Sequence, residues 1–307
     1  MDEFIVCQKV NEYVLADNEK EARNELIKLL NHLKCQKTSY SALVNHFIRV
    51  LGLYPYLDTK TSDWQERFVH RAFQVDTGDG KKTLHREQSY LLKLLLEKKD
   101  IIASAPTSFG KSFVIDAFIA IKKPNSVMII VPTIALVDEK RRRLHKKFSK
   151  IYKIITTPEV SLAEKSIFIF PQERAINYAD KIKEIDILIV DEFYKAGVDF
   201  DKERAPVLLK AIMELRGKAK QRYFLAPNIS KLEENIFTHG MEFVSLDFNT
   251  VYTEILSYYE LSEFSCMSDD SKRDCLLKIL KDKKTKTLIY LTTPISWHFS
   301  GLENSVA

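Results

Sequence analysis

The sequence is short of the residues that mark secreted and zinc-dependent proteins. It has four cysteines among 307 residues, and they form no CxxC pair and have no histidine cluster beside them. A disulfide framework and a structural zinc site are therefore excluded, and reduced thiols in a reducing compartment are expected. The opening residues, 1–14, carry early acidic side chains and too little apolar length for a signal peptide.

Long apolar runs and a one-sided charge are also missing. The longest apolar stretch, residues 127–137, is interrupted by Pro132 and Thr133 and is too short to cross a bilayer. The net charge of +5 permits an anionic partner without requiring one. These features predict a cytoplasmic protein that does not enter a membrane. The hydrophobic content of 45% is sufficient for one or two domains with full cores.

Residues 1–80 are expected to form a helical accessory region. Apolar residues recur at helical spacing in three stretches, 22–33, 43–51 and 64–75, which predicts three helices whose apolar faces pack into a core. Ser62 and Gln65 fit a capping box at the start of the third helix. The turn-rich run at residues 76–80 (DTGDG) predicts the first domain boundary.

From residue 81 to about residue 250, short β-branched runs alternate with amphipathic stretches. This alternation predicts an α/β fold in which a parallel sheet lies between helices. The near-continuous apolar run at residues 187–190 (ILIV) agrees, because parallel strands are buried on both faces. The expected strands are 100–104, 126–131, 151–156, 166–170, 185–190, 222–225 and 242–246, and helices are expected at 111–122, 136–149 and 204–215.

A phosphate-binding loop is predicted between the first of these strands and the helix that follows it. The loop ends in Gly-Lys-Ser, with alanine where many such loops begin with glycine. Gly110 lets the backbone approach a phosphate, Lys111 supplies a positive charge to the β- and γ-phosphates, and the Ser112 hydroxyl can ligate Mg²⁺. The predicted nucleotide-binding residues of the loop are Ala105, Pro106, Thr107, Ser108, Phe109, Gly110, Lys111 and Ser112.

An acidic pair at the end of the 187–190 strand completes the predicted catalytic site. Asp191 is expected to hold Mg²⁺ through its water shell, and Glu192 to polarise the water that attacks the γ-phosphate. An Asp-Glu pair by itself is a weak signal, because strand ends are often solvated. Its place after four apolar residues and downstream of a phosphate loop favours a catalytic role for Glu192 together with Lys111.

These motifs and their order resemble the first RecA-like domain of the superfamily 2 helicases of the DEAD/DEAH-box type. The resemblance covers roughly residues 81–291 and implies ATP, Mg²⁺ and a nucleic acid, DNA or RNA, as ligands. It implies that Gln88, in the stretch 84–88 (LHREQ), recognises adenine. The stretches 131–136 (VPTIAL) and 170–174 (FPQER) are similar to motifs Ia and Ib, which implies contacts to a nucleic-acid backbone from Pro132, Thr133 and Arg174.

Three positions depart from the family pattern. The acidic motif reads DEFY, so Tyr194 stands where Asp or His is usual. The stretch 225–228 (LAPN) lacks the two hydroxyls of motif III, and Phe170 replaces the usual threonine of motif Ib. The combination of DEFYK with a helical N-terminal extension is similar to helicases of bacterial antiphage defence of the Hachiman type.

The C-terminal residues, 251–307, are expected to form a connector and the first strand, 287–291, of an incomplete second RecA-like domain. The family uses that domain for the arginines that complete the ATP site. Two functions therefore stay open: the N-terminal part of an ATP-dependent helicase or translocase, or a truncated ATP- or nucleic-acid-binding regulatory module that does not unwind. A small-molecule kinase is disfavoured, because nothing resembles a lid or an acceptor pocket. A partner effector protein could bind through the N-terminal helices.

A basic run follows the motif Ia stretch. It consists of Lys140, Arg141, Arg142 and Arg143, with Lys146, Lys147 and Lys150. Such a run is often only a solvated helix face, but its position also favours contacts to nucleic-acid phosphates, which would be sensitive to salt. The sequence leaves both interpretations open.

Overall fold

The structure is a computed structural model that describes residues 1–157, 163–197, 202–227, 229–232 and 235–252, with positions 268, 271, 272, 274, 277 and 278. Residues 1–252 form one compact unit, and a second unit begins at Thr253. The predicted strand at 287–291 lies outside the described residues. No helix in the described part of the chain is both long and apolar enough to cross a membrane.

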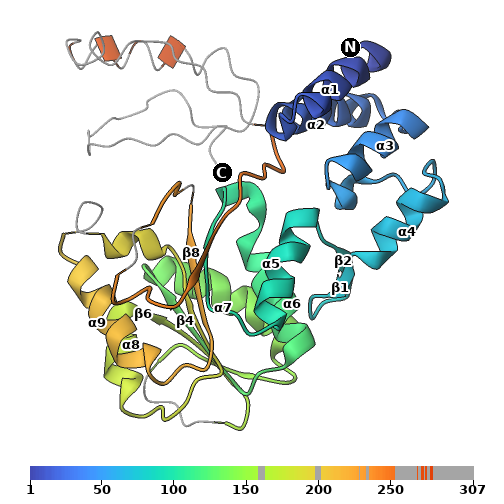
Figure 1. The fold of residues 1–307 in the computed structure, drawn as a ribbon. Coiled ribbons are helices and arrows are strands. Elements are labelled where there is room, and N and C mark those ends of the chain that lie inside the picture. Colours follow the sequence, from blue (N-terminus) through green and yellow to red (C-terminus); the bar gives the residue numbers. More distant parts are fainter. Residues whose placement is uncertain are drawn as a thin grey trace. The chain divides into compact units, whose positions relative to one another are not determined.

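A seven-stranded sheet forms the centre of the first unit (Figure 1), and its order is β5-β6-β4-β7-β8-β3-β9. Every strand pair in it is parallel. All seven predicted strands are confirmed, with shifts of at most two residues at their ends. They are β3 (Ile101–Ser104), β4 (Ser126–Val131), β5 (Lys153–Ile155), β6 (Ser166–Pro171), β7 (Ile187–Val190), β8 (Arg222–Ala226) and β9 (Glu242–Ser245).

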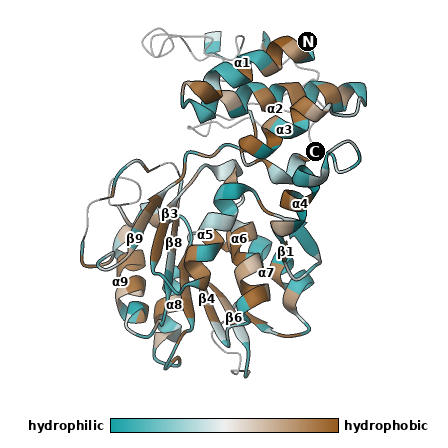
Figure 2. Cartoon of the chain, turned by 45° about the vertical axis from the view of Figure 1, so that its right-hand side comes forward, coloured by the Kyte–Doolittle hydropathy of each residue, from teal (hydrophilic) through white to brown (hydrophobic). Residues whose placement is uncertain are grey.

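Helices cover both faces of this sheet, as predicted for parallel strands. Alternate residues of β4 point to opposite faces: Ile129 packs with one core and Ile130 with the other. The first face is covered by α5 (Arg86–Leu96), α6 (Lys111–Lys122) and α7 (Ile134–Phe148), and the second by α8 (Gln172–Ala179) and α9 (Ala205–Arg216). Figure 2 shows the strands as hydrophobic ribbons between helices with mixed surfaces.

Four helices and a hairpin precede α5 and the sheet. They are α1 (Glu3–Leu15), α2 (Glu19–Gln36), α3 (Ala42–Val50), α4 (Trp64–Ala72), and the antiparallel pair β1 (Gln74–Asp76) and β2 (Lys81–Thr83). The apolar face of α2 is buried as predicted, and its core is continuous with the core on the first face of the sheet. The run at residues 76–80 is the tip of the hairpin, and the domain boundary predicted there stays a prediction.

The predicted packing of α4 is wrong. Trp64 and Phe68 are 68% and 66% exposed, whereas Glu66 on the same helix is buried and pairs with Arg49 at 3.5 Å. The N-cap of α4 is also one residue later than predicted, because Asp63 and Glu66 form the capping box in place of Ser62 and Gln65. A short helix at the edge of the molecule turns its capped, ion-paired side inward, so helical spacing alone did not identify its buried face.

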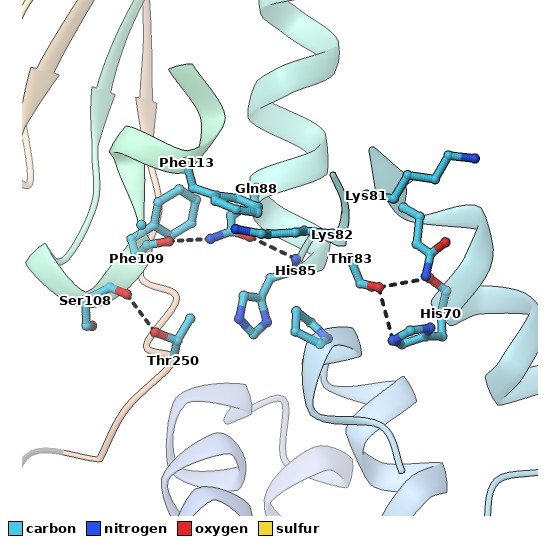
Figure 3. A pocket seen from close by; sticks show the side chains of 13 residues that line it. His70, Lys81, Lys82, Thr83, His85, Gln88, Ser108, Phe109, Phe113 and Thr250 are labelled. Carbon is cyan, nitrogen blue, oxygen red and sulfur yellow. Dashed lines mark hydrogen bonds between the residues drawn. The ribbon is translucent and has the colours of Figure 1, made fainter. Parts of the chain in front are cut away.

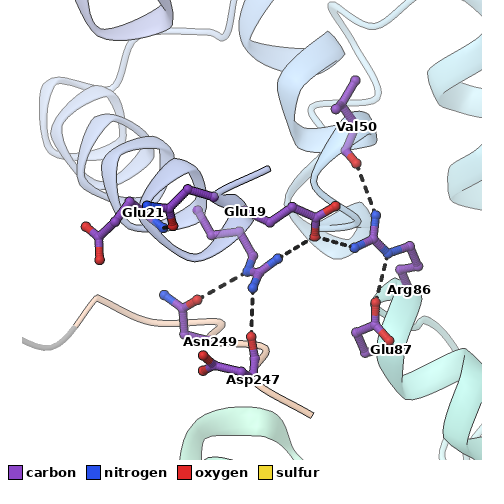
Figure 4. A network of polar contacts seen from close by, with 9 residues as sticks. Glu19, Glu21, Val50, Arg86, Glu87, Asp247 and Asn249 are labelled. Atoms are coloured by element: carbon purple, nitrogen blue, oxygen red, sulfur yellow. Dashed lines mark hydrogen bonds and ion pairs between the residues drawn. The ribbon is translucent and has the colours of Figure 1, made fainter. Parts of the chain in front are cut away.

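A polar network fastens α2 to the end of the first unit (Figure 4). The buried guanidinium of Arg23 donates to Glu19, to the Asn249 side chain and to the carbonyl of Asp247, the last at 2.7 Å. Glu19 also receives a 2.6 Å bond from Arg86 at the start of α5. The network therefore holds the N-terminal helices, α5 and the segment after β9 together.

Candidate nucleotide and nucleic-acid site

The phosphate loop lies between β3 and α6, as its sequence predicts. A short 3-10 turn, η2 (Thr107–Phe109), leads to Gly110, whose φ of 80° is in the left-handed region. A Cβ at this position would lie 2.9 Å from the amide nitrogen of Gln88. The backbone angle therefore favours glycine before the N-terminus of α6, and a larger residue would also displace the Gln88 amide. That N-terminus, with Ser112 in its first turn, is suited to hold an anion.

Lys111 lies inside the loop rather than in solvent. Its Nζ donates to the carbonyls of Ala105, at 2.5 Å, and Pro106, at 3.0 Å. Burial lowers the pKa of Lys111, and the negative charges of Asp191 and Glu192 oppose that shift. The lysine that is predicted to meet a phosphate is thus held at the site by loop carbonyls and faces the acidic pair.

Asp191 and Glu192 follow β7, where the strand meets the loop. The Glu192 amide donates to Oδ1 of Asp191 at 3.0 Å, and the Glu192 backbone has a φ of 54°, which is uncommon for this residue type. Oε2 of Glu192 lies 2.6 Å from Nζ of Lys195. The local backbone thus turns sharply after the strand and brings both carboxylates to the phosphate loop.

A cavity of about 230 Å³ is lined by residues of the phosphate loop, of the acidic motif that begins at Asp191 and of the stretch 225–227. Its lining includes the predicted site residues Lys111, Asp191 and Glu192 together with Tyr194, the residue that departs from the family pattern. The remaining lining residues are Thr107, Gly110, Ser112, Leu225, Ala226 and Pro227. Asn228 of the predicted motif III lies outside the described residues. The sequence predicts one site for Lys111, Ser112, Asp191 and Glu192, and the fold brings these four residues to one cavity.

The donor atoms of this cavity fit Mg²⁺. A carboxylate from Asp191 and a hydroxyl from Ser112 are hard oxygen ligands, which Mg²⁺ prefers, and it commonly completes its shell with water and phosphate oxygens. A cation already stands beside the carboxylate, because Nζ of Lys140 lies 2.7 Å from Oδ2 of Asp191. Within the described ranges no group of three or more His, Cys, Asp or Glu residues could hold a metal, so a metal here would depend on these two residues and a bound phosphate.

A second cavity, of about 580 Å³, is lined in part by Ser108, Phe109 and Gly110 of the phosphate loop (Figure 3). Gln88 lines it and is nearly buried; its Oε1 accepts from the His85 amide at 3.0 Å and its Nε2 donates to the Phe109 carbonyl at 2.6 Å. Phe113 of α6 and Pro55 also line the cavity. The predicted adenine-recognition residue therefore contacts the phosphate loop directly, at the wall of a space large enough for a base.

Sequence reasoning missed the contribution of the N-terminal region to this second cavity. Pro55, His70 and the β1–β2 hairpin supply part of its lining, and the Thr83 hydroxyl lies 3.1 Å from Nε2 of His70. Thr250, far along the chain, lines it as well. No motif marks these residues, because they reach the loop only through the packing of the N-terminal helices.

The three predicted nucleic-acid contacts do not form one cluster of free side chains. Thr133 is the N-cap of α7 and accepts from the Leu136 amide at 3.3 Å, and the carbonyl of Pro132 accepts from Arg204. Arg174 donates to the carbonyl of Thr156 at 3.0 Å. Pro132 and Thr133 are thus placed at a helix N-terminus, where a phosphate can bind, and contact of all three with nucleic acid stays a prediction.

Neither interpretation of the basic run holds for all of its residues. Lys140 is buried against Asp191, and Arg143 and Lys147 pair with the buried carboxylate of Asp116 at 3.4 and 3.0 Å. Burial raises the pKa of Asp116, and the cations of Arg143 and Lys147 oppose that shift. One side of α7 is thus neither solvated nor available to phosphates, because it packs on α6 and the sheet. Arg142, Lys146 and Lys150 are exposed.

Comparisons with known proteins identify two family models and one curated relative that match this chain. Residues 85–227 match the family model "DEAD/DEAH box helicase", and residues 1–67 match "Anti-bacteriophage protein B N-terminal domain". The chain is 30% identical over 271 residues to anti-bacteriophage protein B of Escherichia coli (strain K12). That alignment covers 84% of this chain and 36% of the relative, so the chain spans about a third of the length of the curated protein that it matches.

Solved structures are similar over part of the chain at low identity. The DUF1998 helicase MrfA bound to DNA matches 56% of this chain and 30% of its own, with a TM-score of 0.43 and 15% identity. The Sulfolobus solfataricus SWI2/SNF2 ATPase core in complex with dsDNA matches 46% of this chain and 30% of its own, with a TM-score of 0.37 and 18% identity. On the family matches, the predicted resemblance is confirmed: the chain carries a DEAD/DEAH box helicase domain, preceded by the N-terminal domain that is found in anti-bacteriophage protein B.

Proposed function

We propose that this chain is the ATP-binding part of a nucleic-acid helicase or translocase that hydrolyses ATP with Mg²⁺ and acts in the cytoplasm in defence against bacteriophages. The observation that carries the proposal is the 230 Å³ cavity, which gathers Lys111, Ser112, Asp191 and Glu192 around one space. A lysine and a hydroxyl at a helix N-terminus, with two carboxylates at the end of a strand, are the groups that phosphoryl transfer uses.

Each side chain has a distinct part in the proposed reaction. Lys111 would exchange its two loop carbonyls for phosphate oxygens, and Ser112 and Asp191 would hold Mg²⁺, which would neutralise negative charge on the phosphates. Glu192 orients and deprotonates the attacking water. Gln88 presents its amide to the adenine, whose ring fits the 580 Å³ cavity beside Phe113. The arrangement supports the hydrolysis of a nucleoside triphosphate, with adenine preferred.

The nucleic acid is proposed to bind through phosphates. The N-terminus of α7, with Thr133 as its cap, supplies amide donors, and the exposed Arg142 and Lys146 lie on the same helix. Such contacts recognise the nucleic-acid backbone rather than the base sequence. Because they rest on charged phosphates, the affinity for nucleic acid should fall steeply as the salt concentration rises. DNA and RNA of one sequence are the two ligands to compare.

The test is calorimetry of Mg-ATP binding, followed by ATPase assays with single-stranded DNA, single-stranded RNA or neither. Lys111→Ala should weaken ATP binding roughly ten- to a hundred-fold, because it removes charge-assisted contacts worth about 1.5–3 kcal/mol each. Gln88→Ala should reduce the preference for ATP over GTP. Unchanged affinity in the Lys111 variant would remove the phosphate loop from the proposal. ATP binding without any turnover, with or without nucleic acid, would favour a regulatory module.

A partner protein is proposed to bind the N-terminal helices. Trp64 and Phe68 expose a large apolar surface on α4, and such surfaces commonly mark protein contacts. A photoreactive residue at position 64 should cross-link one partner in phage-infected cells, and Phe68→Ser should weaken that cross-link without changing ATP affinity. Cross-linking that is insensitive to Phe68→Ser would move the contact elsewhere.

A further inference from the structure

Lys140 is a buried lysine whose charge is directed at the proposed metal site. It lies in the middle of α7, is 3% exposed, and places Nζ 2.7 Å from Oδ2 of Asp191. A buried ammonium is costly unless an anion neutralises it. The position is therefore built for this ion pair, and neither the motifs nor the proposed reaction assigns it a role.

Both oxygens of Asp191 have partners within the chain. Oδ2 pairs with Lys140, and Oδ1 accepts from the Glu192 amide at 3.0 Å. The side chain of Asp191 is 17% exposed, so the remaining access to it is from the cavity. The ammonium of Lys140 already neutralises the Asp191 carboxylate and would repel a divalent ion that approaches it.

We propose that Lys140 is a positioning residue that acts as the resident counter-ion of Asp191 and makes metal binding depend on nucleotide. This inference rests on the proposed function, because it assigns a regulation to the same site. Without nucleotide, the ammonium satisfies Asp191 and opposes entry of a second cation. The phosphates of a bound nucleotide supply the additional negative charge that allows Mg²⁺ and Lys140 to lie near one another.

The same contact joins the metal site to the predicted nucleic-acid face. Lys140 belongs to α7, whose first turn is capped by Thr133, and the two residues are seven positions apart, about two helical turns. Because a helix moves as a rigid body, a shift of its N-terminus on a bound strand would move the ammonium relative to Asp191. Lys140 is thus placed to pass such a shift to the metal site.

The test measures metal and nucleotide binding rather than turnover. Mn²⁺ binding to the nucleotide-free chain is followed by electron paramagnetic resonance, and ATP affinity is measured by calorimetry with Mg²⁺ and with EDTA. Lys140→Met should tighten Mn²⁺ binding by about tenfold or more, because the charge that repels the ion is gone. The ratio of the ATP dissociation constant in EDTA to that in Mg²⁺ should rise by a similar factor. Lys140→Gln, which keeps a hydrogen-bond donor, should act alike, and Lys140→Arg should resemble the unchanged chain.

Lys147→Met is the matched control. Lys147 is on the same helix, is nearly buried, and pairs with the buried carboxylate of Asp116 and with Asp79, so its loss removes buried ion pairs at residues that do not line the 230 Å³ cavity. It should lower stability without changing either metal readout. Unchanged Mn²⁺ affinity and an unchanged ratio in folded Lys140→Gln would overturn the inference, as would an equal effect of Lys147→Met. If the unchanged chain binds no ATP at all, the proposed function fails instead.

Discussion

The hydroxyl of Thr250 donates a 2.7 Å hydrogen bond to the carbonyl of Ser108 in the phosphate loop, across 142 positions of the chain. The carbonyl of Thr250 accepts in turn from the Tyr56 hydroxyl, also at 2.7 Å. The segment that leaves the helicase domain, the N-terminal region and the nucleotide site are therefore joined by two consecutive bonds, of which Figure 3 draws the one between Thr250 and Ser108. Both flanking parts are thus connected to the loop that is proposed to bind phosphate.

Removing the Thr250 hydroxyl should loosen the loop. Thr250→Val keeps the shape of the side chain and loses one hydrogen bond, worth about 0.5–1.5 kcal/mol. We expect Mg-ATP affinity to fall roughly two- to tenfold in calorimetry. Thr250→Ser retains the hydroxyl and should bind like the unchanged chain. Equal affinities for the valine and serine variants would show that the loop does not need this bond.

Glu192 should control the chemical step without controlling binding. Glu192→Gln keeps the size of the side chain and removes the base, so the ATPase rate should fall by about 10²–10⁴. ATP affinity should remain within a few-fold, because Lys111 and the loop amides are unchanged. The rate is measured with saturating single-stranded nucleic acid. A near-normal rate would assign the base to another residue.

Stability should depend on acid pH through His85. Burial lowers the pKa of His85 from its usual 6.5 to about 4, and the ring lies between Tyr56 and Phe248. The unfolded chain therefore takes up this proton between about pH 6.5 and pH 4, while the folded chain does not. The stabilising contribution is complete above pH 6.5 and is lost as the pH falls through that window. At about 1.4 kcal/mol per unit of pKa, the loss approaches 3 kcal/mol at pH 4.

Urea unfolding at several pH values checks this dependence. In His85→Asn, the fall in unfolding free energy between pH 6.5 and pH 4 should shrink relative to the unchanged chain, because the proton-binding ring is absent. His46→Asn offers a surface control, since that histidine is on α3 away from the cavity. An identical pH dependence in the unchanged chain and in His85→Asn would show that folding does not lower the pKa of this ring.

Arg23 should contribute more to stability than its neighbour Lys20. Arg23→Met leaves the carbonyl of Asp247 and the Asn249 side chain without their donor in a partly buried place. We expect a loss of about 1–3 kcal/mol in unfolding free energy. Lys20→Met breaks an exposed ion pair with Asp247 and should cost at most about 0.5 kcal/mol. Similar costs for the two variants in urea unfolding would contradict the assigned importance of the network.

The sequence by itself determined the sheet, the helices on both of its faces and the positions of the phosphate loop and the acidic pair. These features are local. A buried parallel strand needs a short apolar run, an amphipathic helix needs a period of 3.6 residues, and the loop needs Gly110 where φ is positive. Because parallel strands end at the same edge of a sheet, motifs that follow different strands were expected to meet, and they do so in one cavity.

Only the tertiary structure decided which charged and apolar side chains are exposed to solvent and which are buried. Lys140 and Arg142 are two positions apart in one basic run, yet one is buried against Asp191 and the other is exposed. Trp64 has the spacing of a core residue and lies in solvent, since Glu66 takes the inner side of α4. The bond from Thr250 to Ser108 has no sequence signal at all. Ion pairs and hydrogen bonds between distant segments depend on how helices pack on the sheet, and local periodicity does not encode that packing.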